Sequence, residues 1–325
     1  MMLRSVVVGV GSYLPKRVMT NAELSKIVDT NDEWIRERTG ISQRHIAADN
    51  EFTSDLATNA AKQALERAEL TAADLDAVIV ATTTPDLTLP STASRVQHKL
   101  GMKRGWATDV SAACAGFIYA IHLADGLIQS GKLKRIMLIG AETYSRIVDW
   151  KDRGTCILFG DGAGAMILEA QPGKGDASDR GVLFSSIHSD GDVFDILYVD
   201  GGVSTTPTKH GYIIMEGKEV FRHAVDKMTD ATVKCLEGAG LRADQLDLLI
   251  PHQANERIMA YISKKLNLKD NQVISTVKDH ANTSAASIPL AMSVAFEKGL
   301  ISKGNIIAMP ALGAGLAWGA CILRW

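Results

Sequence analysis

The sequence lacks the features that mark several classes of protein. It has only four cysteines, all far apart and without a C-x-x-C pair: Cys114, Cys156, Cys235 and Cys321. This argues against a disulfide scaffold and suits a reducing compartment, so we expect a cytoplasmic protein. Basic and acidic residues are balanced, 35 against 37, and no basic stripe points to nucleic acid. The first residues lack the length and cleavage pattern of a secretory signal, so we expect none. Low-complexity segments are absent, and the histidine spacing suggests no metal site.

One uncharged stretch is long enough to resemble a membrane span. Residues 306–323 carry no charge, but Pro310, Gly313, Gly315 and Gly319 divide them into two short apolar runs. The pattern favours two buried strands joined by a glycine turn, so we expect no membrane association.

The 325 residues contain an internal repeat. Residues 66–79 align without gaps with 237–250, and weaker echoes pair 135–141 with 305–311 and 164–168 with 319–323. Three echoes in the same order predict a duplicated α/β unit, with halves at residues 1–175 and 176–325 and a seam around Gln171 to Arg180.

Each half alternates helical patterns with short apolar strands. In the first half we expect helices from residue 53 or 54 to 70, from 91 to 100 and after residue 114, with strands at 77–81, 106–110, 135–140 and 165–168. Strands that are apolar without alternation are typical of sheets covered on both faces. The chain is therefore predicted to be layered α/β, with two sheets sharing a central helical layer.

The strongest candidate for chemistry is Cys114, in the small-residue turn between a strand and a helix. A helix N-terminus carries partial positive charge and unsatisfied N–H groups, so we expect it to lower the pKa of this thiol. A buried cysteine that packs like alanine is the alternative, and it is the preferred interpretation for the other three.

Two polar side chains in the second half complete a plausible set. His252 follows an apolar strand, where α/β proteins often place functional groups, although a hydrogen-bonded loop histidine is the alternative. Asn282 precedes a helix of small residues and could donate to a substrate carbonyl or simply cap the helix. Cysteine, histidine and asparagine together suit a thiol enzyme. The glycine-rich segments at 9–11 and 160–164 match neither a dinucleotide nor a phosphate loop.

A set of motifs in this order resembles the β-ketoacyl-acyl-carrier-protein synthase III family over essentially the whole chain. They are Asp-Glu-Trp-Ile at 32–35, Arg-Thr-Gly-Ile at 38–41, Ser-Ala-Ala-Cys-Ala-Gly-Phe at 111–117, Phe-Gly-Asp-Gly-Ala-Gly-Ala at 159–165, Pro-His-Gln-Ala-Asn at 251–255 and Asn-Thr-Ser-Ala-Ala-Ser at 282–287. The resemblance implies a duplicated thiolase-like fold, layered α-β-α-β-α with two mixed sheets.

It also implies a reaction. An acyl group moves from coenzyme A to Cys114, and malonyl-acyl carrier protein then loses carbon dioxide and attacks the acyl thioester. His252 and Asn282 would donate to the malonyl thioester oxygen. A second oxyanion site would use the backbone N–H groups of Cys114 and of Ala314, in a turn where the family commonly has three glycines in a row. No cofactor or metal is implied.

The same resemblance assigns binding residues. Trp34 and Arg153 would sandwich the adenine of coenzyme A, with three further contacts from Thr30, Arg38 and Asn255, and Arg257 would meet the carrier protein. The acyl pocket would contain Leu89, Phe159, Met215, Phe221 and Leu312, with Leu89 reaching it across a homodimer interface. Leu89 and Leu312 are often phenylalanine in acetyl-specific members, so primer length stays open.

Rival functions differ in what they require. A secondary-metabolism relative would share the fold and Cys114 but use other acyl primers or merely transfer them. A non-catalytic acyl-CoA-binding scaffold would be suggested by loss of the cysteine, histidine or asparagine, all of which are present. A degradative thiolase usually needs a second cysteine near the C-terminus, whereas Cys321 lies within an apolar strand pattern.

Overall fold

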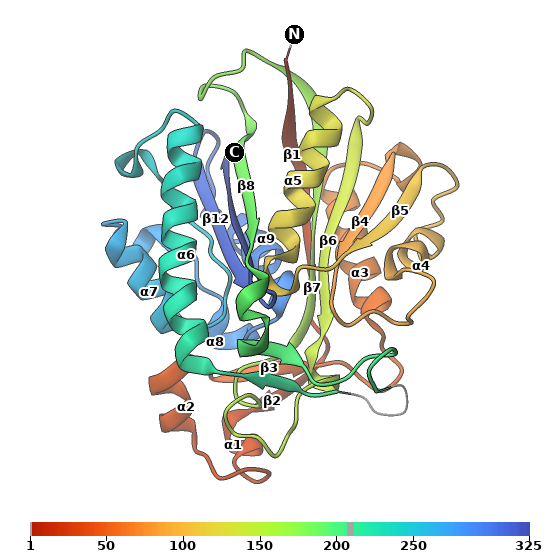
Figure 1. Cartoon of the computed structure of the whole chain (residues 1–325). Helices are drawn as coiled ribbons and strands as arrows, with labels where there is room; N and C mark the ends of the chain where they lie inside the picture. The colour runs from red at the N-terminus through yellow and green to blue at the C-terminus, as the bar shows by residue number, and fades with distance from the viewer. Residues whose placement is uncertain (1, 207–210) are drawn as a thin grey trace.

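The computed structural model describes residues 2–206 and 211–325 (Figure 1). Its first large sheet has the strand order β1-β7-β6-β4-β5, with bounds β1 Met2–Tyr13, β7 Asp161–Gly173, β6 Arg135–Thr143, β4 Ala77–Ala81 and β5 Trp106–Val110. β4 is parallel to both β5 and β6, whereas β7 is antiparallel to β6 and β1. The sheet is therefore mixed, as expected.

The second large sheet has the order β11-β12-β13-β8, with bounds β11 Leu248–Leu249, β12 Ile306–Gly313, β13 Ala317–Arg324 and β8 Gly181–Ser189. β11 is parallel to β12, and β13 is antiparallel to β12 and β8. An isolated parallel bridge between Leu249 and Val273 extends the edge beyond β11. This sheet is also mixed.

The long helices form three layers around these sheets (Figure 1). On the right of the view, α3 (Thr53–Arg67) and α4 (Thr92–Lys99) cover the first sheet, and on the left α6 (Gly217–Gly238) and α7 (Glu256–Lys265) cover the second. Between the sheets lie α5 (Gly116–Gln129) and α9 (Ser287–Glu297). The α-β-α-β-α order predicted from the family resemblance is confirmed.

The central layer is buried because its helices are apolar on more than one face. Phe117, Ile118 and Ile121 of α5 are 0% exposed and belong to a cluster that also contains residues of both sheets. A helix that is hydrophobic all round must be covered on all sides, which the two sheets achieve.

Short elements complete the chain at the lower end of Figure 1 and in the connections. They are β2 Arg17–Thr20, α1 Asn21–Leu24, α2 Asp32–Thr39, β3 Gln43–Ile46, β9 Leu197–Val199, β10 Ile213–Met215 and α8 Val277–His280. The 3₁₀ turns are η1 Ala72–Asp74, η2 Ala113–Ala115, η3 Tyr144–Arg146, η4 Gly191–Ile196, η5 Ala243–Gln245, η6 Asp270–Gln272 and η7 Ser284–Ala286.

The repeat found in the sequence corresponds to equivalent places in the two sheets. The first echo covers the end of α3, η1 and β4 in one copy and the end of α6, η5 and β11 in the other. The second pairs β6 with β12 and the third pairs β7 with β13, so the strands occur in the same spatial order. Residue 175 falls between β7 of the first sheet and β8 of the second.

Most of the predicted elements agree with the structure. The first long helix ends at Arg67 rather than at residue 70, because Glu69 adopts a left-handed φ of 54°. The predicted strand at 165–168 is the middle of the longer β7. The uncharged stretch at 306–323 forms the antiparallel pair β12 and β13, and no helix within the described ranges is long and apolar enough to cross a membrane.

Candidate active site

Cys114 lies in the connection between β5 of the first sheet and α5 of the central layer. β5 ends at Val110, and the thiol belongs to the turn η2 directly before α5. The preceding residue, Ala113, has a φ of 45°, which redirects the backbone into the helix. Cys114 lines a cavity of about 340 Å³. The position at a helix start agrees with the prediction from the sequence.

The predicted effect on the thiol is wrong. Cys114 is 6% exposed, and burial raises its pKa to about 12, because a thiolate loses its hydration there. A hydrogen bond with Ser284 lowers the pKa, but this effect is smaller than that of burial. The thiol is therefore protonated at neutral pH, and its attack on a thioester requires that its proton be removed.

His252 enters the same cavity from the carboxyl end of β11. Its backbone N–H donates to the carbonyl of Pro310 at 2.9 Å, which ties the loop to β12. Nδ1 lies 2.7 Å from Oγ of Ser287, and the same oxygen accepts the N–H of Gln253 at 3.3 Å. We assign the Ser287 hydroxyl proton to Nδ1, which leaves a proton on Nε2. Burial lowers the pKa of His252 to about 3, so the ring is neutral.

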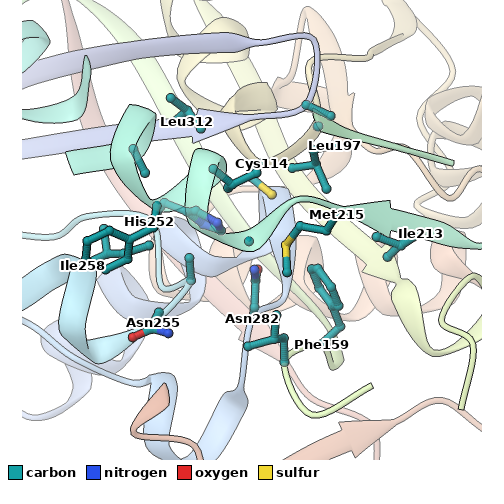
Figure 2. A pocket seen from close by; sticks show the side chains of 18 of the residues that line it. Cys114, Phe159, Leu197, Ile213, Met215, His252, Asn255, Ile258, Asn282 and Leu312 are labelled. Carbon is teal, nitrogen blue, oxygen red and sulfur yellow. The ribbon is translucent and has the colours of Figure 1, made fainter. Parts of the chain in front are cut away.

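The backbone of Asn282 is held by two hydrogen bonds to the segment that contains Leu158 and Gly160. Its N–H donates to the carbonyl of Leu158 at 2.9 Å, and its own carbonyl accepts from Gly160 at 3.0 Å. The side-chain Oδ1 accepts the N–H of Ser284 at 2.8 Å, a cap-like contact that the sequence had offered as the alternative. This contact orients the amide, and Figure 2 shows its nitrogen directed into the cavity lined by Cys114 and His252.

The structure therefore brings together the three residues predicted for catalysis. The same cavity is lined by Phe159, Met215, Phe221 and Leu312 from the predicted acyl pocket and by Ala314 from the predicted oxyanion turn. Figure 2 shows Phe159, Met215 and Leu312 around it. The cavity wall is mostly apolar, which suits an acyl chain. Leu89 does not line it and is 78% exposed in the segment before α4.

The turn between β12 and β13 approaches the nucleophile closely. A Cβ on Gly313 would lie 2.5 Å from the backbone nitrogen of Cys114, so a side chain there is excluded. Within the described residues, the positive φ values of this turn include Gly315 at 134° but not Ala314. An alanine therefore fits at the middle position, where the family commonly has glycine.

The residues predicted to contact coenzyme A gather around α2. Trp34 has Arg153 at 5.0 Å from its ring centroid and Arg38 at 4.9 Å. Thr30 lies just before α2 and has a buried hydroxyl without a partner within the described chain. Asn255 lines the cavity, but both polar atoms of its side-chain amide already form hydrogen bonds within the protein. Its Nδ2 donates to the carbonyl of Arg38 at 3.0 Å, and its Oδ1 caps α7.

Arg257 lies exposed in the first turn of α7, beside this region. The remaining cysteines are buried, and none of them lines the cavity. Cys321 lies in β13, as its apolar pattern predicted. Within residues 2–206 and 211–325, no group of three or more His, Cys, Asp or Glu side chains could hold a metal ion.

Sequence reasoning missed the polar groups behind the cavity. Ser287, which orients His252, is the last residue of the Asn-Thr-Ser-Ala-Ala-Ser motif, in which only Asn282 was predicted to have a role. Gln253 also went unnoticed, although its Nε2 donates to the carbonyls of Pro251 and Ile274 and its Oε1 accepts the N–H of Thr276. Glu142, a carboxylate at the end of a buried strand, was the most visible signal overlooked.

Comparison with known proteins supplies the family. Models described as 3-oxoacyl-[acyl-carrier-protein (ACP)] synthase III and its C-terminal part match residues 108–191 and 236–325. The chain is 56% identical over 322 residues to β-ketoacyl-[acyl-carrier-protein] synthase III of Dinoroseobacter shibae, covering 99% of each chain.

Solved structures agree with this similarity. The 3-oxoacyl-[acyl-carrier-protein] synthase III of Aquifex aeolicus has a TM-score of 0.92 at 45% identity, with 99% of this chain and 100% of that chain covered. The priming β-ketosynthase of the R1128 polyketide pathway has a TM-score of 0.92 at 33% identity, with coverage of 98% and 96%. Identity of this extent along the full length, with the same layered fold, places the chain in the β-ketoacyl-[acyl-carrier-protein] synthase III family.

Proposed function

We propose that this chain catalyses the decarboxylating Claisen condensation of an acyl-CoA primer with malonyl-acyl carrier protein. The products are 3-oxoacyl-acyl carrier protein, carbon dioxide and coenzyme A, and the reaction starts a fatty acid in the cytoplasm. The observation that carries the proposal is the single cavity shared by Cys114, His252 and Asn282, in a chain of this family.

In the first half-reaction, Sγ of Cys114 attacks the acyl-CoA thioester and coenzyme A leaves. The tetrahedral oxyanion is held by the backbone N–H groups of Cys114 and Ala314. The close approach of Gly313 to the Cys114 nitrogen supports this pairing, since it brings the two backbone segments together. Donors already fixed in place stabilise developing charge without reorganisation.

In the second half-reaction, the malonyl thioester oxygen accepts hydrogen bonds from Nε2 of His252 and Nδ2 of Asn282. Carbon dioxide leaves, and the carbanion that forms attacks the acyl group on Cys114, which expels the thiolate. A neutral imidazole donates without adding a positive charge to the cavity. The low pKa of His252, about 3, keeps it in that form throughout the neutral range.

The entrance to the cavity would serve both substrates in turn. The Trp34 indole and the Arg153 guanidinium stack on the adenine of coenzyme A, with Thr30 and Arg38 beside them. Asn255 supports this site by holding the end of α2. Arg257 on α7 meets the acidic carrier protein. No cofactor or metal takes part.

We further propose a homodimer in which Leu89 reaches the partner's acyl tunnel. Large apolar side chains on the surface of the monomer support an interface of this kind. Leu89 is 78% exposed, Leu87 49% and Val203 66%. Leu87 and Val203 line the same surface hollow, and apolar side chains gathered on one surface are typical of surfaces covered by another chain.

A related secondary-metabolism function is the second candidate. It is favoured by Leu89 and Leu312, which differ from the phenylalanines common in acetyl-specific relatives, and by the similarity to a priming ketosynthase. The deciding experiment mixes the protein with acyl-CoAs of increasing chain length, measures the mass of the acylated protein, and then adds malonyl-acyl carrier protein to detect the condensation product. Acetyl to butyryl transfer followed by condensation supports fatty-acid initiation, whereas transfer without condensation favours an acyltransferase.

A further inference from the structure

Glu142 is a buried carboxylate that the proposed mechanism does not use. It lies near the end of β6 and is 0% exposed. Within residues 2–206 and 211–325, its hydrogen-bond partners are hydroxyl and backbone N–H groups and include no lysine or arginine. A buried carboxylate without a paired cation costs folding free energy, which suggests that Glu142 has a function.

The donors around Glu142 form a cradle suited to an anion. Its oxygens accept from Thr84 Oγ1 at 2.5 Å, from Thr82 Oγ1 at 3.1 Å and from the N–H groups of Thr83 and Thr84 at 3.1 Å. Burial raises the pKa of Glu142 to about 7, and these donors limit the rise. The carboxylate can therefore gain or lose a proton near neutral pH.

Ser284 connects this carboxylate to the nucleophile. Its Oγ lies 3.2 Å from Oε1 of Glu142 and 3.0 Å from the hydroxyl of Tyr144, and it is also a hydrogen-bond partner of the Cys114 thiol. The turns η2 and η7, which carry Cys114 and Ser284, pack against each other between the sheets. One hydroxyl thus stands between a thiol and a carboxylate.

The other basic group of the cavity is poorly suited to accept the thiol proton. Nδ1 of His252 is occupied by Ser287, and Nε2 already carries a proton in the assigned tautomer. The titratable groups facing Glu142 are Cys114 and Tyr144, and the Tyr144 hydroxyl, whose pKa is raised well above its ordinary value by burial, stays protonated. Glu142 is the group that remains.

We propose that Glu142, acting through Ser284, accepts the proton of the Cys114 thiol during acyl transfer. As Sγ attacks the thioester carbon, its proton passes to Oγ of Ser284, whose own proton passes to Oε1 of Glu142. The new Sγ–acyl bond forms, the bond to the coenzyme A sulfur breaks, and the leaving thiolate takes the proton back through the same hydroxyl. Glu142 is then ionised again. The inference rests on acyl transfer to Cys114.

The experiment measures acylation of Cys114 in a single turnover between pH 5.5 and 9, using butyryl-CoA, rapid quenching and intact-protein mass spectrometry. In the wild type the rate of Cys114 acylation should rise as the pH passes through about 7, because the ionised carboxylate of Glu142 is the active form. Glu142→Gln is expected to slow acylation by about 10²-fold or more and to abolish that pH step. Its rate of condensation, measured after complete acylation by excess butyryl-CoA, should change far less.

Two further variants separate the relay from folding. Ser284→Ala breaks the connection while keeping the carboxylate, and alanine suits its φ of 49° because Ala113 holds a φ of 45° in the corresponding turn. It should also slow acylation and lose the pH step. Asp161→Asn is the matched control, since Asp161 is another fully buried carboxylate, held by the N–H groups of Ala47 and Ser145 and not by Ser284. It should keep the pH step.

The outcomes are distinct. Acylation of Glu142→Gln and Ser284→Ala at the wild-type rate and with the wild-type pH profile would overturn the relay while leaving the proposed condensation intact. Failure of the wild type to acylate Cys114 with any acyl-CoA would overturn both. Alkylation of Cys114 by iodoacetamide gives a second readout that needs no substrate, and it should lose the same pH step in Glu142→Gln.

Discussion

Two turns at the centre of the molecule have nearly the same backbone and very different chemistry. In η2, Ala113 has a φ of 45° and Cys114 follows; in η7, Ser284 has a φ of 49° and Ala285 follows. Each turn leads into a central helix, and a Cβ on Gly116, the first residue of α5, would lie 3.6 Å from that of Ala285 in the second turn. Duplication gave two equivalent positions for a nucleophile, and only one holds a thiol.

The second turn became the supporting half of the site. Asn282 precedes this turn, Ser284 is its first residue, and Ser287 at the start of α9 forms a hydrogen bond with His252. In the proposed mechanism the two copies divide the reaction. The first supplies the thiol that carries the acyl group and the carboxylate of Glu142, and the second supplies Asn282, Ser284 and Ser287, which donate, relay the proton and orient His252.

The largest expected effect comes from moving the thiol from the first turn to the second. Cys114→Ala should abolish acyl-enzyme formation, and adding Ala285→Cys should not restore it, because Ala285 is 1% exposed within the core and does not line the cavity. Intact-protein mass spectrometry with acyl-CoA measures both. Cys156→Ala, Cys235→Ala and Cys321→Ala serve as controls that keep acylation. A thioester on the double variant would mean that the turns are chemically interchangeable.

Next in size are the donors from the second half. His252→Ala or Asn282→Ala should reduce condensation by roughly 10²–10³-fold, because each removes a fixed donor to the malonyl oxygen. Acyl transfer to Cys114 should fall much less. The two half-reactions are measured separately, by burst acylation and by product formation from the preformed acyl-enzyme. Equal losses in both would show that these residues also activate the thiol.

Ser287 should have a smaller effect on the same half-reaction. Ser287→Ala removes the partner of His252 Nδ1, and condensation should fall roughly tenfold, as expected for one hydrogen bond that fixes a tautomer. Acyl transfer should be unchanged. Ser293→Ala, in the same helix and bonded to Ser12 and Arg67 instead, is the matched control. A similar loss in both variants would indicate a general effect on α9.

The smallest expected effect concerns primer length. If Leu89 and Leu312 leave room beyond an acetyl group, each further methylene contributes about 0.8 kcal/mol, or a few-fold per carbon. The wild type should then accept four-carbon or longer primers, and Leu89→Phe should shift kcat/KM back toward acetyl-CoA. Leu300→Phe, at another leucine that is 50% exposed, is the control. Unchanged ratios for acetyl-, butyryl- and octanoyl-CoA would refute this account of the pocket.

Much of the fold could be predicted because the necessary information is local. Apolar strands, turn residues and three aligned echoes identify the duplication. Cys114 and His252 follow apolar strands and Asn282 precedes a helix of small residues, but their roles came from the family resemblance. The thiol pKa was predicted wrongly because a helix start is visible in sequence, whereas the burial that outweighs it depends on packing by the other half. Glu142 was missed for the same reason. In sequence it is one acidic residue after an apolar run, and its neighbours at 82–84 and 284 are distant in the chain.

The shared central layer has a consequence for how the chain is made. α9, built from residues 287–297, covers β1 and β7, which are complete by residue 173, while α5 packs on β8 and β13 of the other sheet. During synthesis α5 can cover part of the inner face of the first sheet, but the part that packs on α9 stays uncovered until most of the chain has left the ribosome. The two halves must finish folding as one cooperative unit, and a protein cut near residue 175 should yield fragments that stay insoluble unless they are refolded together.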